Sequence, residues 1–244
     1  TSALRDSIGS AKSWLEQERQ CWYSTSVTID GLGSKAFKAG NMSPDAGTQM
    51  LFMLAFHKAT GRLPKGCTGI AQLRHFHQGR YTFIHSLTPE ASTWLESIDN
   101  VDTASGHTEM IEVAKSVSGC FRNAQLDRDF FATMFAMACF QVSGSLKGNA
   151  IASSLNMRLG KYLPGIFEVA SPELLLSNMS IGPAITYIAG VSQREGGLSM
   201  CYRLEADRIR VEIFWNTANA SQDGAKLVEA IRESEAHFKS YLSR

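Results

Sequence analysis

The chain has 244 residues, of which 44% are hydrophobic and 19% charged, a composition typical of a globular protein with a sizeable core. Its formal net charge is +1, so no overall excess of charge predicts binding to nucleic acid or to an anionic membrane. The 5 cysteines include no CxxC pair, which argues against a zinc site and a disulfide framework and favours a reducing, cytoplasmic compartment. The longest apolar run, residues 130–140, is too short to span a bilayer.

The amino-terminal part of the chain alternates helical and extended patterns. The predicted elements are, in chain order, a helix over residues 4–20, a strand over 24–29, a glycine-containing loop that carries Lys35 and Lys38, and a helix over 43–61. The last helix has the clearest boundaries. Ser43 can cap it, Pro44 suits its first position, Asp45 favours the positive end of its dipole, and Gly61 ends it.

The rest of the chain adds more strands. The predicted elements are a buried strand over residues 68–77, a helix that starts at Thr88-Pro89-Glu90, helices over 107–120 and 127–143, strands over 174–180 and 184–190, a hairpin of 198–204 with 208–215, and a terminal helix over 221–242. The terminal helix places Leu227, Ile231 and Phe238 on one side. Together these patterns predict one mixed α/β domain, in which helices pack on a sheet.

Common catalytic motifs are absent from the sequence, which has no GxSxG elbow, no HExxH pair and no P-loop. His75 and His77 share one side of a predicted strand and could bind a metal, although structural histidines are commoner. Lys35 and Lys38 precede a helix amino terminus, where two cations can hold a phosphate group, although a solvated loop is the simpler interpretation. Arg128 enters an apolar helix and needs a carboxylate partner, such as Asp127 or Asp129.

Four blocks of the sequence resemble, in order, segments of the choline/carnitine acyltransferase family. They are the lysine loop followed by SPDAGTQMLFMLAFHKATG (residues 43–61), LRHFHQGRYTFIHS (73–86), LDRDFFATMF (126–135), and the hairpin and helix that start at GGLSMCYRLEADRIRVEIFW (196–215). Each block is loose, but together they extend over roughly residues 30–240 in the family's order.

The resemblance implies a chloramphenicol-acetyltransferase-like fold, a two-layer sandwich of a mixed β-sheet with packed helices. The family has two such halves with the active-site tunnel between them, and its catalytic histidine belongs to the amino-terminal half. No histidine here stands in the family's His-xxx-Asp/Glu-Gly type of motif. We therefore expect residues 1–244 to be the carboxy-terminal subdomain, inactive alone, and the missing initiator methionine fits a domain cut from a longer chain.

The resemblance also assigns candidate residues for the thioester. Lys38 and Asp45 match residues that contact the phosphate and pantetheine regions of coenzyme A, and Lys35 lies next to the position of a second family lysine. Ser177 matches the first residue of the family's Ser-Thr-Ser segment, whose hydroxyl stabilises the oxyanion. Asn178 and Met179 replace the other two, so either Ser177 or Ser180 is expected to fill this role.

The acceptor site departs most from the family pattern. Thr68 and Ile70 stand where the family has a tyrosine and a serine, Tyr81 where it has a threonine, and His85 where it has an arginine. Arg128, which matches the arginine of the family's DRHL segment, is kept. Because much of the polar grip on carnitine's carboxylate is lost, carnitine is not the expected acceptor. The pattern looks like the release domain of fungal highly reducing polyketide synthases.

This resemblance implies transfer of an acyl or polyketide chain from a coenzyme A or phosphopantetheine thioester to an alcohol or polyol. The implied partners are the amino-terminal half, an acyl carrier protein and the alcohol, with no metal and no permanently bound cofactor. Two other interpretations stay open. The chain could be half of an ordinary carnitine or choline acyltransferase, or a non-catalytic module that binds a carrier protein or an acyl chain.

Overall fold

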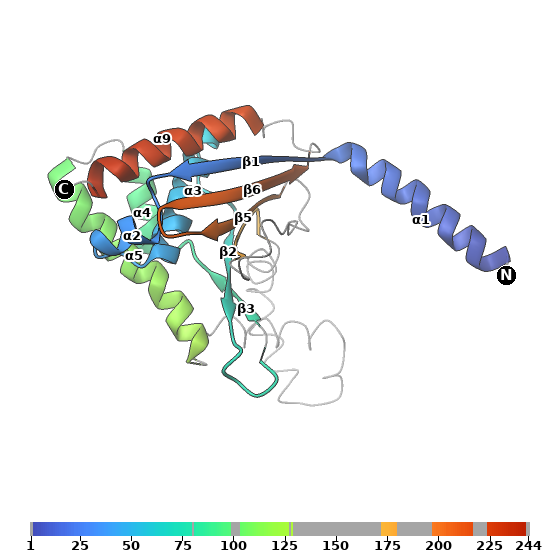
Figure 1. Cartoon of the computed structure of the whole chain (residues 1–244), viewed down its shortest axis with the longest axis horizontal. Helices are drawn as coiled ribbons and strands as arrows, with labels where there is room; N and C mark the ends of the chain where they lie inside the picture. Colours follow the sequence, from blue (N-terminus) through green and yellow to red (C-terminus); the bar gives the residue numbers. More distant parts are fainter. Residues whose placement is uncertain are drawn as a thin grey trace, which may run out of the picture.

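Six strands of the chain form one mixed sheet, in the order β1-β6-β5-β4-β2-β3 (Figure 1). The computed structural model describes residues 2–79, 81–98, 103–126, 128, 172–179, 197–216 and 224–242. The strands are β1 (Trp22–Asp30), β2 (Cys67–Gln72), β3 (Tyr81–His85), β4 (Leu174–Asn178), β5 (Leu198–Leu204) and β6 (Arg208–Asn216).

The direction of the strands creates one edge that matters for the site. Strand β4 pairs in parallel with both β2 and β5, whereas the β1–β6, β5–β6 and β2–β3 pairs are antiparallel. Strands β1, β5, β4 and β2 therefore all end on the same side of the sheet, which we call the carboxyl edge. Ligands of open sheets in α/β proteins usually bind at such an edge.

Helices cover one face of this sheet. They are α2 (Ser34–Ala39), α3 (Pro44–Thr60), α4 (Pro89–Ser97), α5 (Thr103–Gln125) and α9 (Gly224–Leu242). Helix α3 is the central one, because residues 46–56 are all buried, as expected for a helix that is apolar on every side. Apolar residues that alternate along the strands, such as Leu176 and Met200, join the same core.

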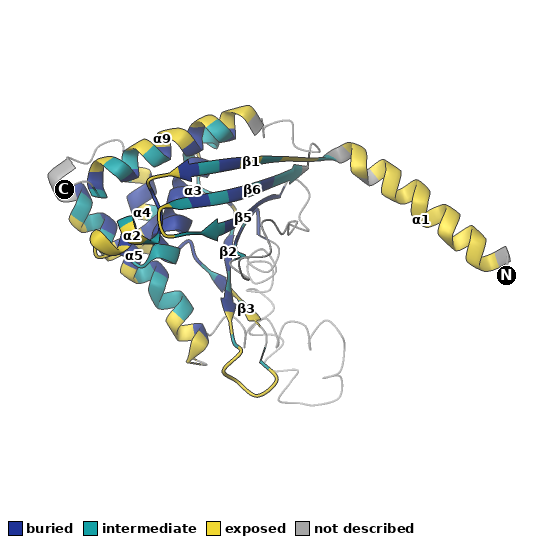
Figure 2. Ribbon diagram, viewed as in Figure 1, coloured by how far each residue is buried: buried dark blue, intermediate teal, exposed yellow. Residues whose placement is uncertain are grey.

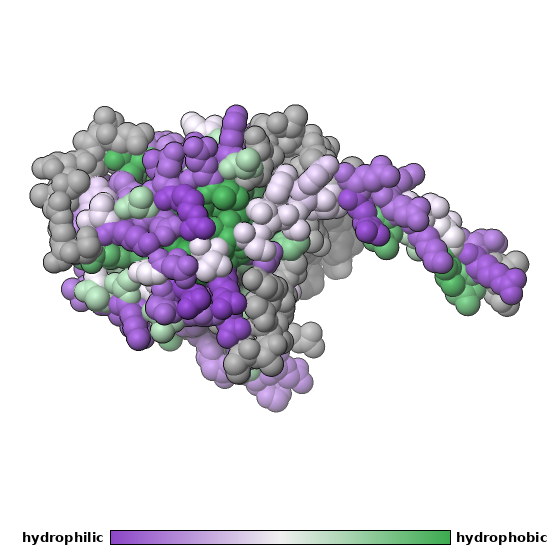
Figure 3. All heavy atoms as spheres, turned by 45° about the horizontal axis from the view of Figure 1, so that its top comes forward, coloured by the Kyte–Doolittle hydropathy of each residue, from purple (hydrophilic) through white to green (hydrophobic). Residues whose placement is uncertain are grey.

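Helix α1 (Ser2–Cys21) projects away from the rest of the molecule (Figure 2). Its apolar residues Leu4, Ile8, Trp14 and Leu15 are between 48% and 61% exposed. Figure 3 shows apolar residues on one side of this helix and hydrophilic residues on the other. The helical spacing predicted from the sequence is confirmed, but within the described chain its apolar side is not buried.

Most of the elements predicted from the sequence are confirmed, including the hairpin of β5 and β6 and the terminal helix. Leu227, Ile231 and Phe238 are indeed buried together on α9. The mixed α/β class with helices layered on a sheet is also confirmed. The helix predicted over 127–143 and the strand predicted over 184–190 lie outside the described residues, apart from Arg128. None of the described helices is long and apolar enough to cross a membrane.

The first wrong prediction concerns the segment that carries Lys35 and Lys38. These residues lie in the short helix α2 and not in a loop. Phe37, which is fully buried, anchors this helix against the core, and its ring packs edge-on against Phe238 of α9. A single buried aromatic residue is too weak a periodic signal to predict a helix from sequence.

The second wrong prediction is the length of the strand that begins near residue 68. Strand β2 ends at Gln72, and a turn follows in which Gln78 has a positive φ of 56°. The chain reverses there so that β3, which was not predicted, can pair with β2 from Gln72↔Tyr81 onward. His75 and His77 thus lie in a turn, and the described residues hold no group of three His, Cys, Asp or Glu suited to a metal ion.

Replacing Gly33 by alanine is expected to destabilise the protein by about 1–3 kcal/mol. A Cβ at this position would lie 2.5 Å from the Arg208 backbone nitrogen and 2.6 Å from that of Asp207, and backbone atoms in a hairpin cannot easily yield. Gly119 in α5 offers a matched control because a Cβ there meets nothing within 4 Å. Gly119→Ala should stabilise the helix by roughly 0.5–1 kcal/mol. Urea denaturation measures both, and equal effects would contradict the steric argument.

Candidate active site

A pocket opens at the carboxyl edge of the sheet, where β2 and β4 separate. The β2–β4 pairing stops at Gly69↔Leu176, so the last residues of β2 have no partner on β4. The pocket has a volume of about 320 Å³, and its lining residues are Asp45, Ile70, Gln72, Arg74, Phe121, Gln125 and Asn178. They come from α3, α5, the ends of β2 and β4 and, for Arg74, the turn after β2, so the fold itself forms the pocket.

Asp45 is the centre of a polar network in the wall of this pocket. Its Oδ1 atom accepts hydrogen bonds from the Tyr202 hydroxyl at 2.6 Å and from the Asn178 side-chain amide at 2.9 Å. The Gln49 amide donates to the same Tyr202 oxygen at 3.3 Å. Tyr202 and Asn178 are directly paired on β5 and β4, and Asp45 opens α3, so the network joins three elements.

Burial controls the ionisation of this network. It raises the pKa of Asp45 above its ordinary value, although the hydrogen bonds from Tyr202 and Asn178 partly oppose this rise. Burial and the charge of Asp45 raise the pKa of Tyr202 well above its ordinary value. Tyr202 therefore stays a hydrogen-bond donor at neutral pH. Because Asp45 already accepts two hydrogen bonds from β4 and β5, it orients the pocket wall.

We expect Asp45→Asn to keep or raise the free energy of unfolding at pH 7, by up to about 1 kcal/mol. The asparagine oxygen can still accept both hydrogen bonds, and the cost of burying a charge disappears. The pKa of Asp45 is higher in the folded state than in the unfolded state. The carboxyl of Asp45 therefore contributes most to the free energy of unfolding at pH values below its unfolded-state pKa. This contribution is lost as the pH rises through its folded-state pKa. Urea denaturation between pH 3.5 and 7 should show this loss in wild type and not in the variant. Marked destabilisation by Asn at pH 7 would contradict the prediction.

A second set of candidate residues points to the face of the sheet opposite the helices. Thr68 and His85 are directly paired on β2 and β3, as are Gln72 and Tyr81, and side chains of paired residues lie on the same face. Ser177 belongs to this face as well, because it alternates with Leu176, which faces the helices. The structure therefore brings four of the predicted residues, Thr68, Tyr81, His85 and Ser177, to one face.

The polar atoms on this face differ in their environment. Ser177 is only 3% exposed, and its hydroxyl donates to the thioether sulfur of Met179 at 3.0 Å, a weak acceptor that a stronger one could replace. Ser199 is buried, and its hydroxyl has no hydrogen-bond partner within the described residues. Burial lowers the pKa of His85, so its imidazole is neutral at physiological pH.

The other predicted site residues lie elsewhere. Lys35 and Lys38 are exposed on α2 and do not line the pocket. Arg128 is exposed just after α5, and its amide nitrogen bonds to the Asn123 carbonyl at 2.8 Å. The carboxylate partners predicted for Arg128, Asp127 and Asp129, lie outside the described residues, as does Ser180.

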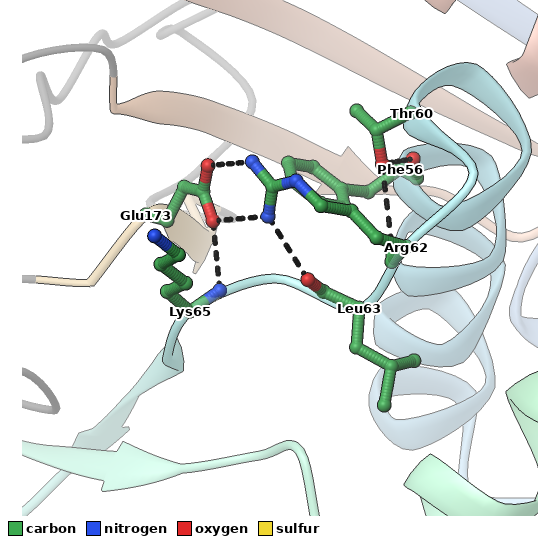
Figure 4. Close-up of polar contacts among 6 residues, drawn as sticks. All are labelled: Phe56, Thr60, Arg62, Leu63, Lys65 and Glu173. Atoms are coloured by element: carbon green, nitrogen blue, oxygen red, sulfur yellow. Dashed lines mark hydrogen bonds and ion pairs between the residues drawn. The ribbon is translucent and has the colours of Figure 1, made fainter.

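A partly buried ion pair between Arg62 and Glu173 holds the strands that carry these residues in register (Figure 4). Glu173, immediately before β4, accepts two hydrogen bonds from the Arg62 guanidinium and one from the Lys65 backbone amide at 2.7 Å. Its own amide donates to the Lys65 carbonyl, and its carbonyl accepts from Leu198 of β5 at 2.7 Å. Glu173 thus fixes the amino ends of β2, β4 and β5 relative to one another.

Comparison with known proteins decides the family. The profile described as Choline/Carnitine o-acyltransferase matches residues 1–233. The chain belongs to the choline/carnitine O-acyltransferase family.

Individual members of the choline/carnitine O-acyltransferase family are similar over shorter stretches. Choline O-acetyltransferase of Sus scrofa is 34% identical over 91 residues, which are 37% of this chain and 14% of that protein. Peroxisomal carnitine O-octanoyltransferase of Rattus norvegicus is 33% identical over 73 residues, which are 30% of this chain and 12% of that protein. The chain therefore matches only a small part of the length of these curated relatives.

A solved chloramphenicol acetyltransferase is similar to the chain with a TM-score of 0.45 and 11% sequence identity. This likeness covers 89% of this chain and 87% of that one.

Sequence reasoning missed two residues of the Asp45 network in this choline/carnitine O-acyltransferase chain, Tyr202 and Gln49. Both stand inside blocks whose resemblance to the family was noted, but neither was assigned a role. An isolated tyrosine in an apolar strand and a glutamine in an apolar helix were the available signals. Buried polar side chains require hydrogen-bond partners. Each of these two residues therefore indicates that a partner lies across the core, but the sequence does not identify that partner.

Proposed function

We propose that the chain is the carboxy-terminal half of an O-acyltransferase that moves an acyl chain from a coenzyme A or phosphopantetheine thioester to a hydroxyl acceptor. The observation that carries this proposal is the family match over residues 1–233. It is supported by the placement of Ser177 and Thr68 as buried hydroxyl groups on the sheet face that the helices leave free. Such a face can form one wall of a cleft whose other wall is the amino-terminal half.

The proposed reaction is direct transfer of the acyl group. A histidine of the amino-terminal half removes the proton from the acceptor hydroxyl as that oxygen attacks the thioester carbonyl. The carbon–oxygen bond forms, and the negative charge on the carbonyl oxygen is held by the Ser177 hydroxyl. When the carbon–sulfur bond breaks, the histidine returns the proton to the departing thiolate. Atoms and charge balance without any other reactant.

The finer proposal is that the donor is a polyketide or fatty acyl chain on a carrier protein and that the acceptor is an alcohol or polyol. Thr68, Tyr81 and His85 support it, because they replace the residues with which family members grip carnitine's carboxylate. Tyr81 is 55% exposed and His85 is neutral, so neither supplies a buried cation for a carboxylate. A neutral alcohol fits this environment better than carnitine does.

The experiment that tests the function uses the full-length protein with an acyl-coenzyme A and, separately, glycerol, carnitine or choline as acceptor. We expect ester formation with glycerol at a rate well above that with carnitine or choline. Preference for choline or carnitine would favour the second candidate, half of an ordinary family enzyme, to which the similarity with choline O-acetyltransferase of Sus scrofa points. If no thioester is consumed with any acceptor, the enzyme proposal fails and a non-catalytic binding module remains.

A further inference from the structure

Five cations gather at the carboxyl edge around the tip of the β5–β6 hairpin. They are Lys35 and Lys38 on α2 together with Arg203, Arg208 and Arg210 on the hairpin, and we call them the basic hairpin surface. The lysines are exposed, and the arginine side chains are between 22% and 38% exposed. The mechanism proposed above uses none of the three arginines.

Backbone hydrogen bonds make α2 and the hairpin tip one rigid unit. The amides of Gly31, Ser34 and Lys35 donate to the carbonyls of the turn between β5 and β6, at 2.8, 2.8 and 2.9 Å. Gly33 lies so close to this turn that no Cβ would fit. Figure 1 shows α2 beside the end of the hairpin. The spacing between lysines and arginines is therefore fixed by the fold and does not depend on a flexible loop.

Two of the arginines form a like-charged pair that a single glutamate bridges. Arg203 and Arg210 are directly paired across β5 and β6, and like charges in directly paired positions repel. Glu205 lies between them, with its Oε1 3.5 Å from the Arg203 Nε and 3.3 Å from the Arg210 Nε. Arg208 also approaches Glu205, at 3.5 Å. One carboxylate is thus shared by three guanidinium groups.

The local charge stays positive after the acids that form ion pairs with the arginines are counted. Besides Glu205, Asp207 lies 3.5 Å and Asp30 lies 3.9 Å from the Arg208 Nε. These three carboxylates oppose the five cations, which leaves an excess of positive charge here although the whole chain has a net charge of only +1. Within the described part of the chain, the Nε atoms of Arg208 and Arg210 are buried and donate no hydrogen bond, but the two side chains are 38% and 31% exposed. The exposed ends of these guanidinium groups can therefore meet an external anion.

The surface and the pocket share the carboxyl edge of the sheet. Arg203 directly follows Tyr202, whose hydroxyl bonds to Asp45 in the pocket wall, and its side chain lies on the opposite face of β5 from that of Tyr202. A partner that docks on the basic hairpin surface would therefore be positioned to extend a slender group toward the pocket.

We infer that the basic hairpin surface docks an acidic face of the protein that carries the phosphopantetheine thioester. This inference rests on the proposed function and identifies the partner's chemistry. Complementary charge gives such transient complexes their orientation and fast association. The carboxylates that lie among the arginines would repel the phosphates of a nucleic acid. They therefore favour a protein partner whose charge is mixed but mainly acidic.

The test neutralises Arg203 and Arg210 together, as R203Q/R210Q, in the full-length protein. Binding of a bacterial holo acyl carrier protein and of free coenzyme A is measured by calorimetry at low and moderate salt. We expect carrier affinity to fall about tenfold and coenzyme A affinity to change less than twofold. The matched control, K115Q/K226Q, removes two exposed cations on α5 and α9 and should change neither affinity. Thermal unfolding should show little change of stability in R203Q/R210Q, because the variant removes a repulsive pair together with its partly exposed ion pairs to Glu205.

Unchanged carrier affinity in R203Q/R210Q would overturn the inference. An equal loss of coenzyme A affinity would also overturn it, because the surface would then be a phosphate site only. A parallel assay with an acyl-coenzyme A donor separates this failure from failure of the proposed function. If the variant and wild type both acylate the alcohol from coenzyme A, the catalytic proposal stands whatever the carrier result.

Discussion

Ser177→Ala is expected to lower kcat of the full-length acyltransferase roughly 100-fold or more, with little change in KM, as measured for other single oxyanion donors. The hydroxyl is buried and, among the described residues, donates to the thioether sulfur of Met179, so the oxyanion of the tetrahedral intermediate is a far stronger acceptor than its present partner. Since this acceptor exists only in the transition state and intermediate, the loss should fall on kcat. Steady-state kinetics with an acyl thioester and the alcohol acceptor measures it.

A matched control for this prediction is Ser234→Ala. Ser234 is equally buried, but its hydroxyl donates to the Ala230 carbonyl within α9, remote from the strand ends. Its replacement should leave kcat within about twofold of wild type. A decrease of less than about threefold for Ser177→Ala would exclude Ser177 as the oxyanion donor. Ser180 would then be the residue to test.

The second large effect is expected for Glu173→Ala, which should lower the free energy of unfolding by about 2–3 kcal/mol. Glu173 has a side chain only 6% exposed, whereas Arg62 is 43% exposed, so water compensates part of the lost ion pair. The Lys65 amide would also lose its hydrogen-bond acceptor in a partly buried position, which adds to the cost. Because Glu173 aligns β2 with β4, activity should fall together with stability.

Glu112→Ala provides the comparison for an ion pair that is exposed. Glu112 pairs with Lys115 at 2.6 Å on the surface of α5, with side chains 62% and 65% exposed. Its loss should change stability by less than about 0.5 kcal/mol. Urea denaturation of both variants measures the contrast. Similar effects for the two glutamates would contradict the role that we assign to burial.

Elements with strong local signals could be predicted from the sequence. Pro44 and Gly61 bound α3, Thr88 caps α4 through a hydrogen bond to the Ala91 amide, and period-two apolar patterns define the β5–β6 hairpin. Strand β3 could not be predicted, because Tyr81 and Phe83 are exposed and its pairing with β2 decides its conformation. The end of β2 depends on that same hairpin pairing.

The candidate site could be predicted only in part, and only through the family resemblance. Asp45 and Ser177 were identified by position in the family's motifs, but neither composition nor spacing indicates that Asp45 is bonded to Tyr202 or that Ser177 shares a face with Thr68. These relations join residues more than 100 positions apart, such as Thr68 and Leu175. Contacts at that separation leave no periodic trace in a single sequence.

The same long separations constrain how the molecule can be made. Within the described sheet, strand β1 near the start of the chain pairs with β6 alone, from Trp22↔Asn216 to Asp30↔Arg208. At a synthesis rate of about 5–20 residues per second, the ribosome would release β1 roughly 10–40 s before its partner exists. During that interval its apolar residues Val27 and Ile29 stay uncovered, which predicts that the nascent polypeptide depends on chaperones and that truncation before β6 yields aggregated protein.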